Sequence, residues 1–331
     1  MKKKRMVFFI LTVLLVSALT GCKEASGGKS KVTLNEVAHS VFYAPMYVAL
    51  EEGYFEEEGL EVTLVTGFGA DKTMTALLSD EADIGFMGPE TTLYTYQGDM
   101  ADYAVNFAQL TQRAGNFLVG REPEESFSFS DLKGKEVLGG RAGGMPQMVF
   151  EYILKKNGLN PQTDLTIDQS IDFGSTAAAF SGGQGQYTIE FEPHATLLEE
   201  KGDGYVLASL GEESGYVPYT AFSAKKSYIE ANPQIIEAFV AALQKGTEYV
   251  NSHTAEEVAA AIKPQFEEME EETLATIIAR YQSQDSWKND LVFEQEAFEL
   301  LQDILMDAGV LEERLPYEVL VDTRFTSPIE E

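Results

Sequence analysis

The chain has 331 residues, of which 44% are hydrophobic and 24% are charged, a composition typical of a globular protein that has room for two lobes. Its formal net charge of −30 at pH 7 repels DNA, RNA and anionic lipid, so the sequence argues against a nucleic-acid-binding protein. With a single cysteine, an intrachain disulfide and a cysteine-based metal site are both excluded.

The first 21 residues have the anatomy of a secretory signal peptide. A basic start, Lys2 to Arg5, precedes an apolar core from Met6 to Leu19, whose length of about 14 residues is short of the roughly 20 that span a bilayer. We predict a signal peptide over 1–21, and its removal leaves 20 basic and 54 acidic residues, a charge of −34.

The sequence Leu19-Thr20-Gly21-Cys22 at the end of this segment resembles the bacterial lipobox. The resemblance implies that Cys22 is lipid-modified, that 22–30 is a flexible tether rich in glycine and serine, and that the protein is held at the outer face of the bacterial cell membrane. An ordinary signal peptide followed by a free thiol is the alternative.

A strand–helix–strand unit follows the tether. Val32–Val37 reads as a buried strand, a helix opens at Pro45 and closes at Gly53, and 60–64 alternates between apolar and polar residues as a half-buried strand does. Ligands of such sheets bind beyond the carboxyl ends of the strands. This places 39–43 and 67–69 on the rim of one pocket.

Three later strands also end in turns that would face this rim. The strand over 83–87 runs into Gly88-Pro89-Glu90, and the strand over 136–139 runs into a glycine-rich loop ahead of a helix over 146–157. The strand over 187–191 runs into Glu192-Pro193-His194. Beyond Pro218 the chain is expected to be helical, and Thr254 with Glu257 forms a capping box.

Two changes in composition suggest where the chain passes between lobes. Val119–Ser130 turns polar after a long apolar stretch, and Gly211–Gly215 offers a return. We predict an α/β fold of two lobes, each a mixed, mostly parallel sheet flanked by helices, with 31–119 and 218–331 in the first lobe and 120–217 in the second.

The sequence lacks the usual signatures of catalysis. There is no GxSxG elbow, no phosphate-binding P-loop and no HExxH pattern, and the three histidines are far apart in the sequence. We expect a binding protein without a cofactor or a metal ion.

The residues most suited to hold a ligand are those near the predicted strand ends, and several have a second interpretation. Aromatic side chains there stack on a flat ring or belong to the core, and carboxylates there accept from amino donors or serve as caps and ion-pair partners. The glycine-rich loop with Arg141 either binds an anion or is a tight turn. The candidates are His39, Phe42, Tyr43, Phe68, Gly88, Glu90, Arg141, Gly143, Gly144, Met145, Gly174, Glu190 and Glu192, with His194 as a further histidine on the rim.

Two segments carry a family resemblance that covers nearly the whole mature chain. HSVFYAPMYVALEEGYFEEEGLEV and GADKTMTALLSDEADIGFMGPE, together with the lipobox and the helical tail, resemble the solute-binding proteins of nitrate, taurine, alkanesulfonate and thiamine-pyrimidine importers. The resemblance implies a type II periplasmic-binding-protein fold that closes on a small molecule like a hinge, acts as a monomer, and delivers its solute to a permease and an ATPase.

Three classes of function are open: a solute-binding protein with one of two ligand classes, an enzyme, and an adhesin or sensor. The candidate carboxylates and aromatics favour a thiamine pyrimidine precursor or a similar heteroaromatic, whereas Arg141 and the glycine loop favour an alkanesulfonate, taurine or a related anion. One enzymatic branch, the fungal thiamine-pyrimidine synthase, carries a CCCFC segment that this chain lacks. A surface adhesin or sensor subunit is the third class.

Overall fold

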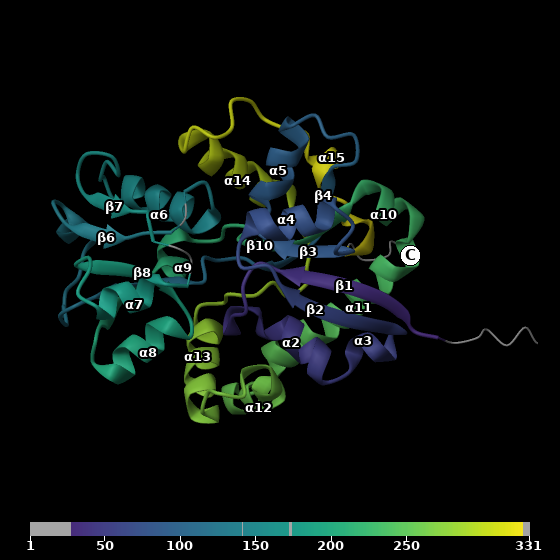
Figure 1. Ribbon diagram of the computed structural model, residues 1–331, viewed down its shortest axis with the longest axis horizontal. Helices are drawn as coiled ribbons and strands as arrows, with labels where there is room; N and C mark the ends of the chain where they lie inside the picture. The colour runs from purple at the N-terminus through teal and green to yellow at the C-terminus, as the bar shows by residue number, and fades with distance from the viewer. Residues whose placement is uncertain (1–27, 141, 172–173, 327–331) are drawn as a thin grey trace, which may run out of the picture.

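The computed structural model describes residues 28–140, 142–171 and 174–326, which form two α/β lobes side by side (Figure 1). The first sheet has the strand order β2-β1-β3-β10-β4 and comprises β1 (Ser30–Glu36), β2 (Leu60–Thr66), β3 (Ile84–Met87), β4 (Ala104–Thr111) and β10 (Thr220–Lys225). The second has the order β7-β6-β8-β5-β9 and comprises β5 (Asn116–Gly120), β6 (Glu136–Leu138), β7 (Thr166–Asp168), β8 (Tyr187–Phe191) and β9 (Tyr205–Ser209).

In each sheet one strand runs against the other four. β1 pairs in parallel with β2 and β3, whereas β10 lies antiparallel to β3 and β4. Likewise β6 pairs in parallel with β7 and β8, whereas β5 lies antiparallel to β8 and β9. The predicted two-lobed fold with mixed, mostly parallel sheets is confirmed.

Helices flank both sheets and make up most of the C-terminal part. The first lobe contains α2 (Ala44–Glu51), α3 (Tyr54–Glu57), α4 (Ala70–Leu78) and α5 (Glu90–Gln97), and the second contains α6 (Met145–Lys156), α7 (Thr176–Ser181), α8 (His194–Lys201) and α9 (Leu210–Ser214). After β10 follow α10 (Lys226–Ala231), α11 (Pro233–Ser252), α12 (Ala255–Ile262), α13 (Glu271–Ser283), α14 (Gln295–Asp307) and α15 (Tyr317–Leu320). Short 3-10 turns are η1 (Val41–Tyr43), η2 (Phe129–Leu132), η3 (Lys263–Phe266) and η4 (Thr323–Phe325). None of the helices within the described ranges is at once long and apolar enough to cross a membrane.

Local chemistry explains where several elements begin and end. Pro45 lies in the first turn of α2, where its missing N–H costs nothing, and Gly53 follows that helix with a φ of +74°, in the left-handed region that glycine adopts freely. The predicted capping box of α12 is present, with Thr254 and Glu257 bonding each other's backbone N–H. Asp71 lies in the first turn of α4 and is not its cap, because that helix begins at Ala70, one residue earlier.

The first passage between the lobes lies earlier than predicted. β4 ends at Thr111 in the first sheet and β5 begins at Asn116 in the second, so the chain passes over 112–115 and the predicted passage at 119–130 is wrong. Every residue of both strands is buried, so the passage is a short break between two buried strands and not the longer polar stretch that follows β5. The second passage, 215–219, lies between α9 and β10 and includes the predicted boundary at 217/218, whereas α9 occupies most of the predicted return at 211–215.

Two C-terminal helices brace the second lobe from opposite sides, with α14 above and α13 below the junction in Figure 1. Asp307 at the end of α14 pairs with Lys155 of α6 at 2.6 Å. Arg280 of α13 pairs with Glu192 and Glu199 beside β8 and on α8. The two lobes are therefore joined by the two passages and by the contacts of these helices.

Candidate functional site

A cavity of about 590 Å³ lies between the two lobes. The first lobe contributes the ends of β1 and β3 and the starts of α4 and α5, the second contributes the start of α6, and the second passage contributes Tyr219. This volume is within the range of 300–1,000 Å³ that is usual for small-molecule sites.

Glu90 is the buried carboxyl of this cavity. It is the first residue of α5, it is 2% exposed, and its Oε2 has no hydrogen-bond partner within the described part of the chain. Burial raises the pKa of Glu90 to about 8, although backbone N–H groups, that of Met145 among them, act against the shift. A Cβ at Gly88 would collide with the Glu90 carboxylate oxygens, so the glycine leaves room for this side chain.

The other walls are aromatic and apolar. Tyr43, Tyr94 and Tyr219 line the cavity, and the Tyr219 hydroxyl is a second buried polar atom that the described residues leave without a partner. The hydroxyl of Tyr94 donates to the Gly143 carbonyl at 3.1 Å across the gap between the lobes. Burial raises the pKa of all three phenols, so they remain protonated. As far as the chain is described, no lysine or arginine lines this cavity.

A second, smaller cavity of about 90 Å³ adjoins the first and shares Tyr43, Pro146 and Phe191 with it. Its buried carboxyl is Glu190 on β8, which accepts from the Thr188 hydroxyl at 2.6 Å. Burial raises the pKa of Glu190 to about 7, while hydroxyl donors lower it in part.

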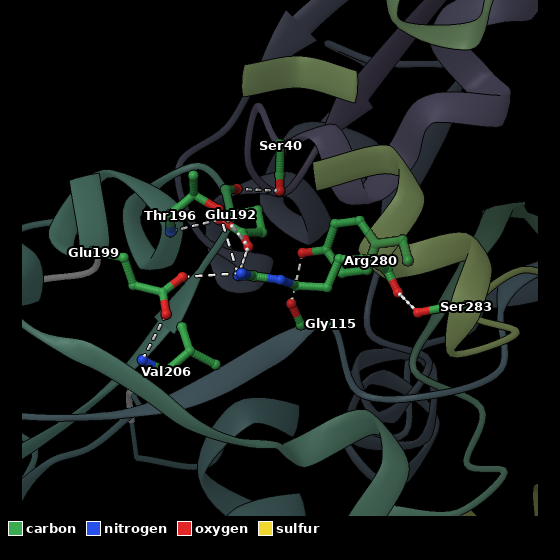
Figure 2. Close-up of polar contacts among 9 residues, drawn as sticks. Ser40, Gly115, Glu192, Thr196, Glu199, Val206, Arg280 and Ser283 are labelled. Carbon is green, nitrogen blue, oxygen red and sulfur yellow. Dashed lines mark hydrogen bonds and ion pairs between the residues drawn. The ribbon is translucent and has the colours of Figure 1, made fainter. Parts of the chain in front are cut away.

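Glu192 also borders the smaller cavity, but its oxygens are already bound. The Arg280 guanidinium donates to Oε1 at 2.6 Å, and the hydroxyl and backbone N–H of Thr196 donate to Oε1 and Oε2 (Figure 2). Arg280 also donates to Glu199 at 2.9 Å, and Ser40 of the first lobe donates to the Glu192 carbonyl at 2.8 Å. Glu192 thus holds the lobes and α13 together.

His39 borders the smaller cavity with both ring nitrogens occupied. Nδ1 lies 2.9 Å from Glu36 Oε1, and Nε2 lies 2.9 Å from the Gln265 carbonyl. Burial alone would lower the pKa of His39. The hydrogen bonds to Glu36 and Gln265 raise the pKa by more than burial lowers it, so the net shift is upward. His194 borders the same cavity, and burial lowers its pKa.

The structure brings most of the predicted candidates together in these two cavities. The larger one is lined by Tyr43, Gly88, Glu90, Gly143, Gly144 and Met145, and the smaller one by His39, Tyr43, Gly174, Glu190 and Glu192. Arg141 and the predicted lipidation site Cys22 lie outside the described residues.

Two aromatic candidates lie outside both cavities. Phe42 is fully buried against the first passage, where a Cβ at Gly115 would lie 2.5 Å from its ring, and its carbonyl accepts from the Trp287 indole at 2.7 Å. Phe68 is 63% exposed on the surface. Their positions correct the expectation that these rings face a ligand, because packing at the passage takes up Phe42 and Phe68 projects into solvent.

Several lining residues were not among the predicted candidates. Tyr219 belongs to the second passage, which has no motif, and Phe191 lies between Glu190 and Glu192 at the end of β8, where the carboxylates give the stronger signal. Tyr94 lies one helical turn after Glu90, so the i, i+4 spacing on α5 offered a usable signal. No group of three or more metal-ligating side chains occurs among the described residues.

Comparison with known proteins finds a matching family model, similar sequences and solved structures of the same fold. The NMT1/THI5 like family model matches residues 41–257. The "Putative binding protein YtlA" of Bacillus subtilis (strain 168) is 44% identical over 318 residues, which cover 96% of this chain and 95% of that protein. The alkanesulfonate-binding protein SsuA from Xanthomonas axonopodis pv. citri, solved with MOPS, has a TM-score of 0.71 at 16% identity and covers 89% of this chain and 98% of its own. A 4-amino-5-hydroxymethyl-2-methylpyrimidine phosphate synthase from Aspergillus parasiticus is 21% identical over 225 residues, 65% of this chain and 64% of its own.

Proposed function

Because this chain belongs to the NMT1/THI5-like family, and because its two lobes enclose a cavity, we propose that it captures a small solute outside the cytoplasm and delivers it to an ABC importer. The proposal is supported by the 44% identical "Putative binding protein YtlA" of Bacillus subtilis and by the fold shared with the alkanesulfonate-binding protein from Xanthomonas axonopodis. The partners would be a permease and an ATPase, and the protein would act as a monomer.

The solute that this cavity suits best is a flat heteroaromatic with an amino group beside a ring nitrogen, as in a thiamine pyrimidine precursor. The observation that carries this proposal is the buried Glu90 carboxyl with its unpartnered Oε2 among tyrosine and methionine walls. With a pKa of about 8, Glu90 is mostly protonated at pH 7 and presents one donor and one acceptor side by side. An amino group next to a ring nitrogen has the complementary pair, and the aromatic walls cover the faces of the ring.

A sulfonate or a related small anion is the second candidate. The fold of SsuA and the glycine-rich loop that precedes α6 favour it. Against it, no lysine or arginine lines the larger cavity within the described chain, and its acidic residues Glu90 and Asp71 offer an anion no opposite charge.

A panel of ligands separates the two candidates. We expect 4-amino-5-hydroxymethyl-2-methylpyrimidine to raise the melting temperature of the purified protein and alkanesulfonates to leave it unchanged. A ligand at a hundred times its Kd stabilises the folded state by about 2.7 kcal/mol, which a thermal shift detects easily. If sulfonates alone stabilise the protein, the proposed solute is an anion and not the heteroaromatic.

Two further parts of the proposal have their own tests. Anchoring through a lipid on Cys22 requires that Cys22→Ala releases the protein from membranes, and continued partitioning into membranes would refute it. The absence of catalysis requires that the pyrimidine be recovered unchanged after incubation with the protein. A product detected by mass spectrometry would favour the enzymatic branch that the Aspergillus parasiticus synthase represents.

A further inference from the structure

The smaller cavity is a compartment of the same cleft. It adjoins the larger cavity along a wall formed by Tyr43, Pro146 and Phe191, which border both. Its volume of about 90 Å³ corresponds to about three water molecules at 30 Å³ each, so it accommodates a short substituent and not a ring.

Glu190 is the group in this compartment that is prepared for a ligand. Its side chain is 2% exposed, and hydroxyl groups, that of Thr188 and that of Thr176, are its donors. Within the described residues no lysine or arginine forms an ion pair with it. A carboxylate that is buried against hydroxyls alone is costly to keep, unless a stronger donor arrives.

Two other polar side chains of the compartment, Glu192 and His39, are already engaged. Glu192 is bound by Arg280 and Thr196, and both nitrogens of His39 are used by Glu36 and Gln265. The backbone at Gly139 and Gly140 and at Gly174 contributes wall without side-chain bulk. Of the two carboxyls of the compartment, Glu190 is therefore the one left to accept from an entering donor.

We propose that the smaller cavity is a second subsite, in which Glu190 accepts a hydrogen bond from a short arm of the solute that carries an amino or hydroxyl donor. The inference rests on the proposed function, because the ring of that solute occupies the larger cavity beside Glu90. The solute class becomes an amino heteroaromatic with one donor-bearing substituent one carbon from its ring. An aminomethyl arm binds more tightly than a hydroxymethyl arm, because its charge reinforces the hydrogen bond.

A matched pair of probes tests the subsite: 4-amino-5-aminomethyl-2-methylpyrimidine and its analogue with a plain methyl group at position 5. Their Kd values are measured by calorimetry at pH 7.5 for the native protein, E190Q and E136Q. Glu136 is an exposed carboxylate at the start of β6 in the same lobe, so E136Q is a control for the loss of one negative charge. Circular dichroism verifies that each variant is folded.

For the native protein we expect the aminomethyl probe to bind at least about tenfold more tightly than the methyl probe. E190Q reduces this ratio to about twofold and changes the Kd of the methyl probe by less than about twofold. E136Q preserves the native ratio. A native ratio near one, or a ratio that E190Q leaves unchanged while the methyl probe binds, overturns the subsite and leaves the proposed function standing. Failure of both probes to bind the native protein overturns the heteroaromatic ligand of the proposed function and the subsite with it.

Discussion

Glu90 and Glu192 are equally buried carboxyls in the same cleft, yet their surroundings differ. Glu192 is bound by a guanidinium, a hydroxyl and a backbone N–H, whereas Glu90 Oε2 has no partner in the described chain. A fully bound carboxylate joins parts of the protein, and an incompletely bound one is a site at which a ligand supplies the missing hydrogen bond. The contrast separates the structural part of the cleft from its binding part.

Removing Arg280 disrupts the structural part of the cleft and should give the largest change in the free energy of unfolding. Arg280→Ala leaves Glu192 buried without its cation, and breaking a buried ion pair in this way costs about 3–5 kcal/mol. Urea denaturation should show this loss in the free energy of unfolding. If the loss is below about 1 kcal/mol, the pair behaves like an exposed surface pair and the contrast with Glu90 fails.

Replacing Glu90 should raise the free energy of unfolding, whereas replacing Arg280 lowers it. Glu90 ionises near 4.5 in the unfolded chain and near 8 in the folded protein, so across that window the unfolded state has lost a proton that the folded state keeps. The free energy of unfolding of the native protein therefore falls as the pH rises from 4.5 to 8, and the full cost is present above 8.

Glu90→Gln removes this dependence on pH. We expect the variant to be more stable than the native protein by roughly 2–4 kcal/mol at pH 8.5, with the difference vanishing near pH 4.5. Denaturation curves at the two pH values measure it. Parallel pH profiles of the two proteins would show that Glu90 is not the group that titrates.

Binding of the heteroaromatic should depend on Glu90 and not on its charge. Glu90→Ala removes both hydrogen bonds to the solute and weakens binding by about 10- to 100-fold, while Glu90→Gln keeps a donor and an acceptor and stays within about fivefold. For the native protein, affinity falls as the pH rises above about 8, because ionised Glu90 no longer donates. Calorimetry at pH 7 and 9 tests all three expectations, and an unchanged Kd for Glu90→Ala contradicts them.

The smallest effect is expected at Ser40, which links the first lobe to the backbone beside Glu192. Ser40→Ala removes the donor to the Glu192 carbonyl and the cap of η1, a loss of about 1 kcal/mol. A fall in the denaturation midpoint with an unchanged slope would agree with this value. A loss as large as that of Arg280→Ala would mean that Ser40, and not the ion pair, dominates this junction.

Local sequence patterns were enough to predict several elements and the edge at which a site would form. Pro45 and Gly53 delimit α2, the Thr254–Glu257 box begins α12, and the strand-end rule selected Glu90 and Glu190. These features depend on neighbours within a few residues, or on the general rule that parallel strands end at one edge, so local chemistry is sufficient to find them.

The division of similar residues between structural and binding roles depends on the assembled fold. The passage at 112–115 lies between two strands that are buried throughout, Phe42 is taken up by packing on Gly115, and Glu192 becomes a structural group because Arg280 arrives from 88 residues away. Burial, close approach and ion pairing between distant segments are properties of the assembled fold. For this reason no local pattern distinguishes Glu192 from Glu90.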